Sequence, residues 1–221
     1  MKKLTYYQSI RKNVVIAFAT LTLFCFLLLL IRAKVTQSVF FFFLIWNLFL
    51  AFIPYLISFF LFTSVTFQER RFLRIGTLLV WLLFLPNSFY LLTDFVHINK
   101  FPDVPFWFDL VLVSSFSITG FALGLFSIRT IEKIIELHYS KIQSKIMLFC
   151  ILYLTAFGIY LGRFLRFNSW DLLANPIDLF ASCVDCLFMR DVQNFTIGFG
   201  TFLLVLYFVS SSIVSKNYHH D

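Results

Sequence analysis

Residues 14–31 read VVIAFATLTLFCFLLLLI and contain no charged side chain, and this run indicates the class of fold. A helix needs about 20 mostly apolar residues to cross the hydrocarbon core of a bilayer. Five further runs of this kind follow along the chain. The sequence therefore predicts an all-α membrane protein with six transmembrane helices in a single polytopic domain, residues 1–221, with spans near 14–31, 39–63, 72–93, 106–128, 146–164 and 195–214.

The overall composition supports the same class. Hydrophobic residues make up 60% of the chain, charged residues make up 13%, and 33 residues are phenylalanine. A soluble domain of this length has too little interior to bury so many large apolar side chains. The composition excludes a soluble protein and makes the lipid bilayer the first partner of the chain.

The distribution of Lys and Arg predicts how the helices are oriented. With the N-terminus inside, the inner segments hold twelve of these residues and the outer segments hold six. This excess favours both termini in the cytoplasm. The basic segment before residue 14 is similar to the start of a signal peptide, but residues 31–34 offer no small-residue cleavage site, so we expect an uncleaved first helix. The net charge of +7 then reflects topology and anionic headgroups and gives no reason to expect nucleic-acid binding.

The first polar cluster ends the third span, in WLLFLPNSFYLLTDFVH at residues 81–97. Its polar side chains recur at i, i+3, i+7 and i+10, which lines them up on one face of a helix: Asn87, Tyr90, Asp94 and His97. Pro86 precedes them and removes one backbone hydrogen bond, which favours a kink. Ionisable groups at the edge of a bilayer are costly and mark candidate sites.

The second polar cluster ends the fifth span, in GIYLGRFLRFNSWDLL at residues 158–173. If the helix continues through it, Arg163, Arg166 and Trp170 share a face. Two guanidinium groups suit a carboxylate or phosphate. The structural alternative is that both arginines only pair with acids of the chain, namely Asp94, Asp109 or Asp171. Asn168 with Asp171 also has the spacing of a helix N-cap followed by an acid.

The directions of the spans place both clusters at the same depth, near the outer face of the membrane. Spans three and five run outward, span four starts at the outer face with Trp107 and Asp109, and span two carries Asn47 about 12 Å below it. The sequence therefore predicts one polar site at the outer membrane face. Its candidate ligand-binding residues are Asn47, Asn87, Tyr90, Trp107, Asp109, Arg163, Arg166, Asn168, Trp170 and Asp171.

Asp94 and His97 are the candidates for catalysis, as a general acid or base. A divalent metal ion on the same two residues is a weaker alternative, since the chain has four histidines and no HExxH motif, and no other cofactor is indicated. Each residue also has a plainer interpretation: His97 as a surface histidine, and Asp109 as an acid that complements the dipole of its helix.

Three smaller patterns concern packing. Asn175-Pro176 begins an apolar repeat to residue 188, which is too short to span and predicts an amphipathic interfacial helix between spans five and six that lies over the site. That segment contains Cys183 and Cys186, whose spacing favours a disulfide if oxidants reach it. Gly120-xxx-Gly124 and Gly158-xxx-Gly162 predict close contact between spans four and five, with Asp109 near Arg163.

The strings WNLFLAFIP (46–54), WLLFLPNSFYLLTDFVH (81–97) and GIYLGRFLRFNSWDLL (158–173), with Trp107-x-Asp109, resemble a family of bacterial integral membrane proteins called domain of unknown function 1361. The resemblance covers roughly residues 40–214. It implies a multi-span protein of a bacterial cell membrane and supports the choice of residues, and it carries no catalytic role.

Two classes of function follow. In the first, the protein binds or processes an anionic lipid-linked molecule or envelope precursor, with Arg163 and Arg166 holding the anion. In the second, it is a noncatalytic membrane component, either a partner subunit or a small transporter, whose polar cluster is a structural ion-pair network. The oligomeric state is left open by the sequence.

Overall fold

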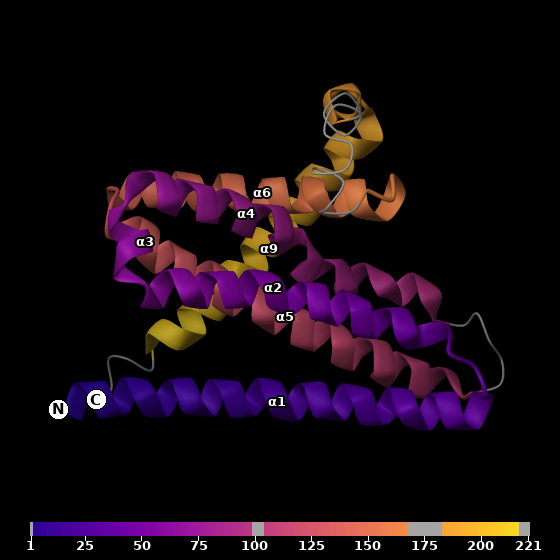
Figure 1. Ribbon diagram of the computed structural model, residues 1–221. Coiled ribbons are helices and arrows are strands. Elements are labelled where there is room, and N and C mark those ends of the chain that lie inside the picture. The colour runs from indigo at the N-terminus through magenta and orange to yellow at the C-terminus, as the bar shows by residue number, and fades with distance from the viewer. Residues whose placement is uncertain (1, 99–103, 168–182, 217–221) are drawn as a thin grey trace.

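The structure is a computed structural model that describes residues 2–98, 104–167 and 183–216. Six of its helices are long and apolar enough to cross a bilayer, which confirms the predicted all-α membrane fold (Figure 1). They are α1 (Lys2–Thr36), α2 (Phe43–Thr63), α4 (Arg71–Tyr90), α5 (Phe106–Glu136), α6 (Lys141–Phe164) and α9 (Arg190–Lys216).

Short elements complete the described chain. A 3-10 turn, η1 (Phe40–Phe42), leads into α2, and α3 (Val65–Glu69) connects α2 to α4. A 3-10 helix, η2 (Leu91–His97), continues directly from α4. The short helix expected between spans five and six is present, since residues 183–187 are helical; the rest of its predicted range, up to residue 182, lies outside the described residues.

The two ends of the bundle differ. The start of α1, the end of α9 and α3 lie together at the end that we call the terminal end (Figure 1). The opposite end, which we call the polar end, carries η1, η2, the start of α5 and the end of α6. The first polar cluster and the described part of the second, up to residue 167, therefore share one end of the molecule (Figure 1).

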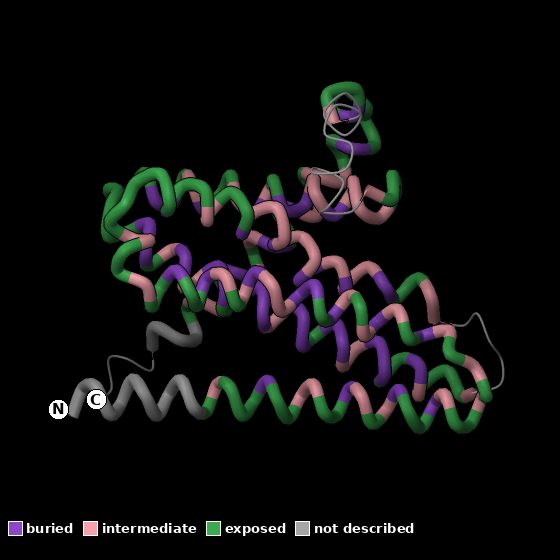
Figure 2. The backbone as a smooth tube through the Cα atoms, viewed as in Figure 1, coloured by how far each residue is buried: buried purple, intermediate pink, exposed green. Residues whose placement is uncertain are grey.

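Helix α5 is the most buried of the six spans and lies between α1, α2 and α4 (Figure 2). It continues to Glu136, beyond the predicted end at residue 128. The apolar stripe explains this extension, because Ile131, Ile134 and Ile135 remain buried between exposed polar positions. Helices α6 and α9 pack mainly on each other, on the far side of α4.

The prediction that the glycine faces of spans four and five pack on each other is wrong. A Cβ added to Gly120 meets the carbonyl of Ser88 at 2.8 Å, and one added to Gly124 meets the Phe89 ring. A Cβ added to Gly158 meets the Pro86 ring at 2.6 Å. Both faces therefore pack against α4 and η2 rather than against each other, because the segment around Pro86 fills the space between α5 and α6.

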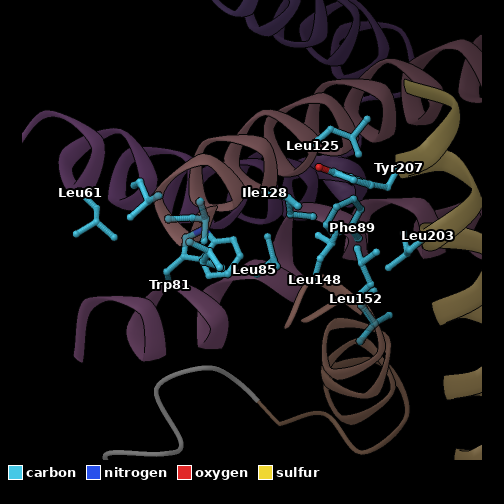
Figure 3. Close-up of a cluster of buried hydrophobic side chains, with 14 residues drawn as sticks. Leu61, Trp81, Leu85, Phe89, Leu125, Ile128, Leu148, Leu152, Leu203 and Tyr207 are labelled. Carbon is cyan, nitrogen blue, oxygen red and sulfur yellow. The ribbon is translucent and has the colours of Figure 1, made fainter. Parts of the chain in front are cut away.

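Hydroxyl and indole groups tie the buried helices together. Trp81 donates its Nε1–H to Ser127 at 2.7 Å, and Ser127 in turn donates to the carbonyl of Pro54 at 2.8 Å, which joins α4, α5 and α2. Around this relay lies a cluster of large apolar side chains that includes Leu85, Phe89 and Tyr207 (Figure 3). Hydrogen bonds of this kind supply directional contacts where lipid removes the hydrophobic drive between helices.

Replacement of Gly120 tests the packing of α5 on α4. The change Gly120→Ala is expected to cost about 1–3 kcal/mol, because the new methyl group meets a backbone carbonyl that cannot rotate away. The apparent melting temperature in detergent should fall. Gly198→Ala is the matched control, since nothing lies within 4 Å of a Cβ there. An unchanged melting temperature for Gly120→Ala would contradict the close approach.

Candidate functional site

The centre of the polar end is an ion pair between α6 and η2. Arg163 Nη1 donates to Asp94 Oδ1 at 2.9 Å, and Asn47 of α2 donates to Asp94 Oδ2 at 3.1 Å. The Asp94 side chain is 0% exposed, whereas that of Arg163 is 14% exposed. Both carboxylate oxygens are thus satisfied inside the protein, as the burial of a charge requires.

The second terminal nitrogen of Arg163 binds the same segment. Its Nη2 donates to the Thr93 carbonyl at 2.9 Å and to His97 Nε2 at 3.1 Å. Because a guanidinium has no acceptor, His97 Nε2 accepts this bond, and the imidazole is neutral with its proton on Nδ1. The guanidinium also lies 5.4 Å from the centre of the Tyr90 ring. Four residues of α4 and η2 therefore orient one arginine.

The 3-10 geometry of η2 explains how one guanidinium reaches both Asp94 and His97. Side chains at i and i+3 eclipse in a 3-10 helix, so Asp94 and His97 lie directly in line. The sequence predicted α-helix through residue 93, with the same residues on a broader helical face. In the structure the α-helix ends at Tyr90, four residues after Pro86.

A second ion pair lies between α1 and the start of α5. Arg32 Nε donates to Asp109 Oδ1 at 2.7 Å and Arg32 Nη2 donates to Asp109 Oδ2 at 3.2 Å. The two side chains are 1% and 3% exposed. The expectation that Asp109 lies near Arg163 is wrong, because Asp109 is neutralised by a bidentate pair with Arg32 instead.

Phenylalanine side chains of residues 40–43 connect the two ion pairs. Arg32 Cζ lies 4.3 Å from the Phe41 ring centre, and Phe41 stacks on Phe43 at 6.0 Å. Phe43 meets the His97 ring edge-on at 5.2 Å. An unbroken chain of cation–π and aromatic contacts thus runs from Arg32 to the ring that accepts a bond from Arg163.

The structure gathers some of the predicted site residues and separates others. Asn47, Tyr90, Asp94, His97 and Arg163 meet in the first ion-pair cluster. The Tyr90 hydroxyl also donates to the Gly162 carbonyl at 3.4 Å. Asn87 donates to the Phe84 carbonyl of its own helix at 3.0 Å. Trp107 is 62% exposed, on the outside of α5.

Arg166 does not continue the face of Arg163. Helix α6 ends at Phe164, and Arg166 is exposed in the left-handed region with φ 63°. That conformation is costly for a residue with a Cβ, and it turns the chain at the helix end. The condition for a shared face of Arg163, Arg166 and Trp170 is therefore not met. Asn168, Trp170 and Asp171 lie outside the described residues.

The metal alternative gains no third ligand from the structure. Within residues 2–98, 104–167 and 183–216, no group of three His, Cys, Asp or Glu side chains gathers in a way that would hold an ion. Asp94 and His97 instead share Arg163.

The two cysteines after α6 are free thiols. Burial raises the pKa of the Cys183 thiol, and neighbouring Cys186 raises it further. Since the thiolate is the reactive form, this environment slows oxidation and alkylation at neutral pH.

Sequence reasoning used Arg32 only as a topology residue and missed its pairing. The signal was present, because Arg32 directly follows the uncharged run 14–31 and so lies at the edge of the apolar zone. A cation at that level needs a partner. Asp109, in the first turn of span four, was a candidate for that partner.

A bundle of six candidate spans with buried ion pairs at one end defines a polytopic α-helical membrane protein. Residues 46–206 match the family model described as protein of unknown function (DUF1361), and the chain belongs to this family. No curated protein and no solved structure matches the chain.

Removal of one partner of the Arg32–Asp109 pair should be far more harmful than removal of both. Asp109→Leu or Arg32→Met alone leaves a buried charge without a partner, which costs about 3–5 kcal/mol. The double variant should recover most of that loss, because an apolar pair needs no desolvation. The measurement is the melting temperature of all four proteins in detergent.

The double variant also shows whether Arg32 and Asp109 stabilise the fold as a pair. If its loss of stability equals the sum of the two single losses, the pair does not act as a unit.

Proposed function

We propose that the polar end binds the anionic group of a lipid-linked or envelope molecule, with Arg163 and Arg166 as the residues that contact it. The observation that carries the proposal is the fixed orientation and partial exposure of the Arg163 side chain. Its guanidinium is oriented from one side by Asp94, Thr93 and His97, yet its side chain is still partly exposed. An arginine held in this way loses little further freedom when it binds a phosphate or carboxylate.

The donor inventory of Arg163 supports this role. A guanidinium has five N–H donors. The described contacts use three of them, one to Asp94, one to the Thr93 carbonyl and one to His97. None of these three contacts uses Nε, so we assign the Nε–H donor to a single charge-assisted hydrogen bond with the anion.

Asp94 and Asn47 serve as positioning residues in this proposal. Asp94 is fully buried, so it acts on a ligand only through the arginine that it holds. His97 serves in the same way, because its Nε2 accepts a hydrogen bond from Nη2 of the same guanidinium. Arg166 is exposed two residues after the end of α6 and adds a second positive charge.

We further propose that the polar end faces the outside of a bacterial cell membrane and that both termini are cytoplasmic. The excess of Lys and Arg on the terminal side supports this orientation. An envelope or lipid-linked anion is then the class of ligand available at that face.

One observation favours a different function, that of a noncatalytic membrane component. The Arg32–Asp109 pair is almost completely buried and bidentate, as is typical of an ion pair with a structural role. If Arg163 and Asp94 act in the same way, the polar end is a structural network that holds α1, α5, α6 and η2 together. Ligand retention separates the two functions.

Gently extracted protein should carry an anionic molecule that native mass spectrometry detects. Arg166→Gln should reduce its retention about tenfold or more without a change in melting temperature, since Arg166 is exposed. Arg163→Gln should lose both the ligand and stability, because it leaves the buried Asp94 carboxylate without its counter-ion.

Arg190→Gln is the matched control, since Arg190 is exposed at the start of α9. It should retain the ligand at the wild-type level. Protein that is empty in every preparation, with elemental analysis negative for phosphorus and metal, would favour the structural network.

Cysteine labelling tests the orientation. In a chain whose four native cysteines are replaced, Val96→Cys at the polar end should react with an impermeant maleimide in intact cells. Tyr139→Cys, between α5 and α6, should react only after the membrane is opened. The reverse pattern would overturn the orientation.

A further inference from the structure

At the terminal end, α2, α3 and α4 border an open apolar groove that is separate from the ion-pair clusters. Its volume is about 510 Å³, and its lining is almost entirely hydrocarbon. The residues on which the argument rests are Leu56, Phe60, Phe67, Phe72, Gly76 and Val80. Volumes of this size are typical of sites for small apolar ligands, about 300–1,000 Å³.

The groove has unfilled space beside Gly76 of α4. Nothing lies within 4 Å of a Cβ added to Gly76, so this position of α4 leaves space that other side chains of the bundle do not fill. Phe72, at 89% exposed, and Phe60, at 49% exposed, stand along the same surface. The groove therefore faces the hydrocarbon that surrounds the bundle.

The turn that closes the groove is held by polar contacts. Gln68 donates through Nε2 to the carbonyls of Leu61 and Phe62 at 2.9 Å and 2.7 Å, which satisfies the end of α2. The Arg74 guanidinium donates back to the Gln68 carbonyl. These bonds tie α3 to both neighbouring helices, so the walls of the groove are preformed.

Positive charge lies where the groove meets the membrane surface. Arg70 and Arg71 are exposed and directly precede Phe72, and Arg74 follows one turn later. Glu69 is the single acid in this stretch. Arg74 is buried and bonded to the Gln68 carbonyl, so the two exposed arginines, Arg70 and Arg71, are the cations that face the surface, and they favour an anionic headgroup.

We infer that this groove is a binding site for an anionic phospholipid from the leaflet on the terminal side. One acyl chain lies along Phe60, Gly76 and Val80, and the phosphate lies at Arg70 and Arg71. The apolar lining matches the chain and the arginines match the headgroup. This inference is independent of the anion proposed at the polar end.

Native mass spectrometry of the purified full-length chain with added phosphatidylglycerol tests the assignment, with phosphatidylcholine as the zwitterionic comparison. Wild-type protein should bind the first phosphatidylglycerol more tightly than phosphatidylcholine. Gly76→Leu fills the groove and should weaken that first binding event about tenfold or more. The double variant Arg70→Gln/Arg71→Gln should bind the two lipids equally.

Gly198→Leu is the matched control, because Gly198 is also a helical glycine with open space around it and lies on α9. It should bind lipid as wild type does. If Gly76→Leu does not fold, Gly76→Ala and Val80→Trp replace it as smaller and larger fillings of the same space.

Two results would overturn the inference. The first is equal binding of phosphatidylglycerol by Gly76→Leu and Gly198→Leu. The second is a dimer that is lost in Gly76→Leu while lipid binding is unchanged, which would assign the groove to a second copy of the chain.

Discussion

The requirement that a buried charge must have a partner organises the polar end of this molecule. Arg163 with Asp94 and Arg32 with Asp109 each join segments far apart in the sequence, and each pair is satisfied by further hydrogen bonds or aromatic faces. An unpaired ion at this depth would cost more than most other contacts of the fold provide. The helix ends of α1, α5, α6 and η2 are therefore positioned by charge pairing at least as much as by shape.

The segment from Pro86 to His97 has a second structural role, since helices pack on it from both sides. Gly120 and Gly124 let α5 approach it closely, and Gly158 lets α6 do the same at Pro86. The polar and the apolar requirements of the bundle thus meet in a single stretch. It holds Arg163 through its side chains and its Thr93 carbonyl, while its backbone and rings form the surface on which two helices lie.

Hydropathy was sufficient for the six spans, because the length of an apolar run is a local property of the sequence. The first cluster was also predictable in part, since Asp94, Tyr90 and His97 are near neighbours in one segment. The choice of partner was not predictable. Two arginines and two acids at one level allow more than one pairing, and only the packing of α1 along α5 assigns Asp109 to Arg32. The glycine patterns likewise marked close approach but could not say to which helix.

The 3-10 geometry of η2 also determines how far its seven residues extend along the helix axis. At about 2.0 Å per residue a 3-10 helix advances further than an α-helix does at about 1.5 Å, so this segment extends roughly 3.5 Å more than α geometry would allow. The angular step differs as well, about 120° against 100° per residue. Winding the segment into α geometry would therefore turn His97 about 60° away from Asp94 and draw it back along the axis. The joint contact of Asp94 and His97 with Arg163 is thus a property of the helix type, and rewinding these seven residues would separate the two side chains.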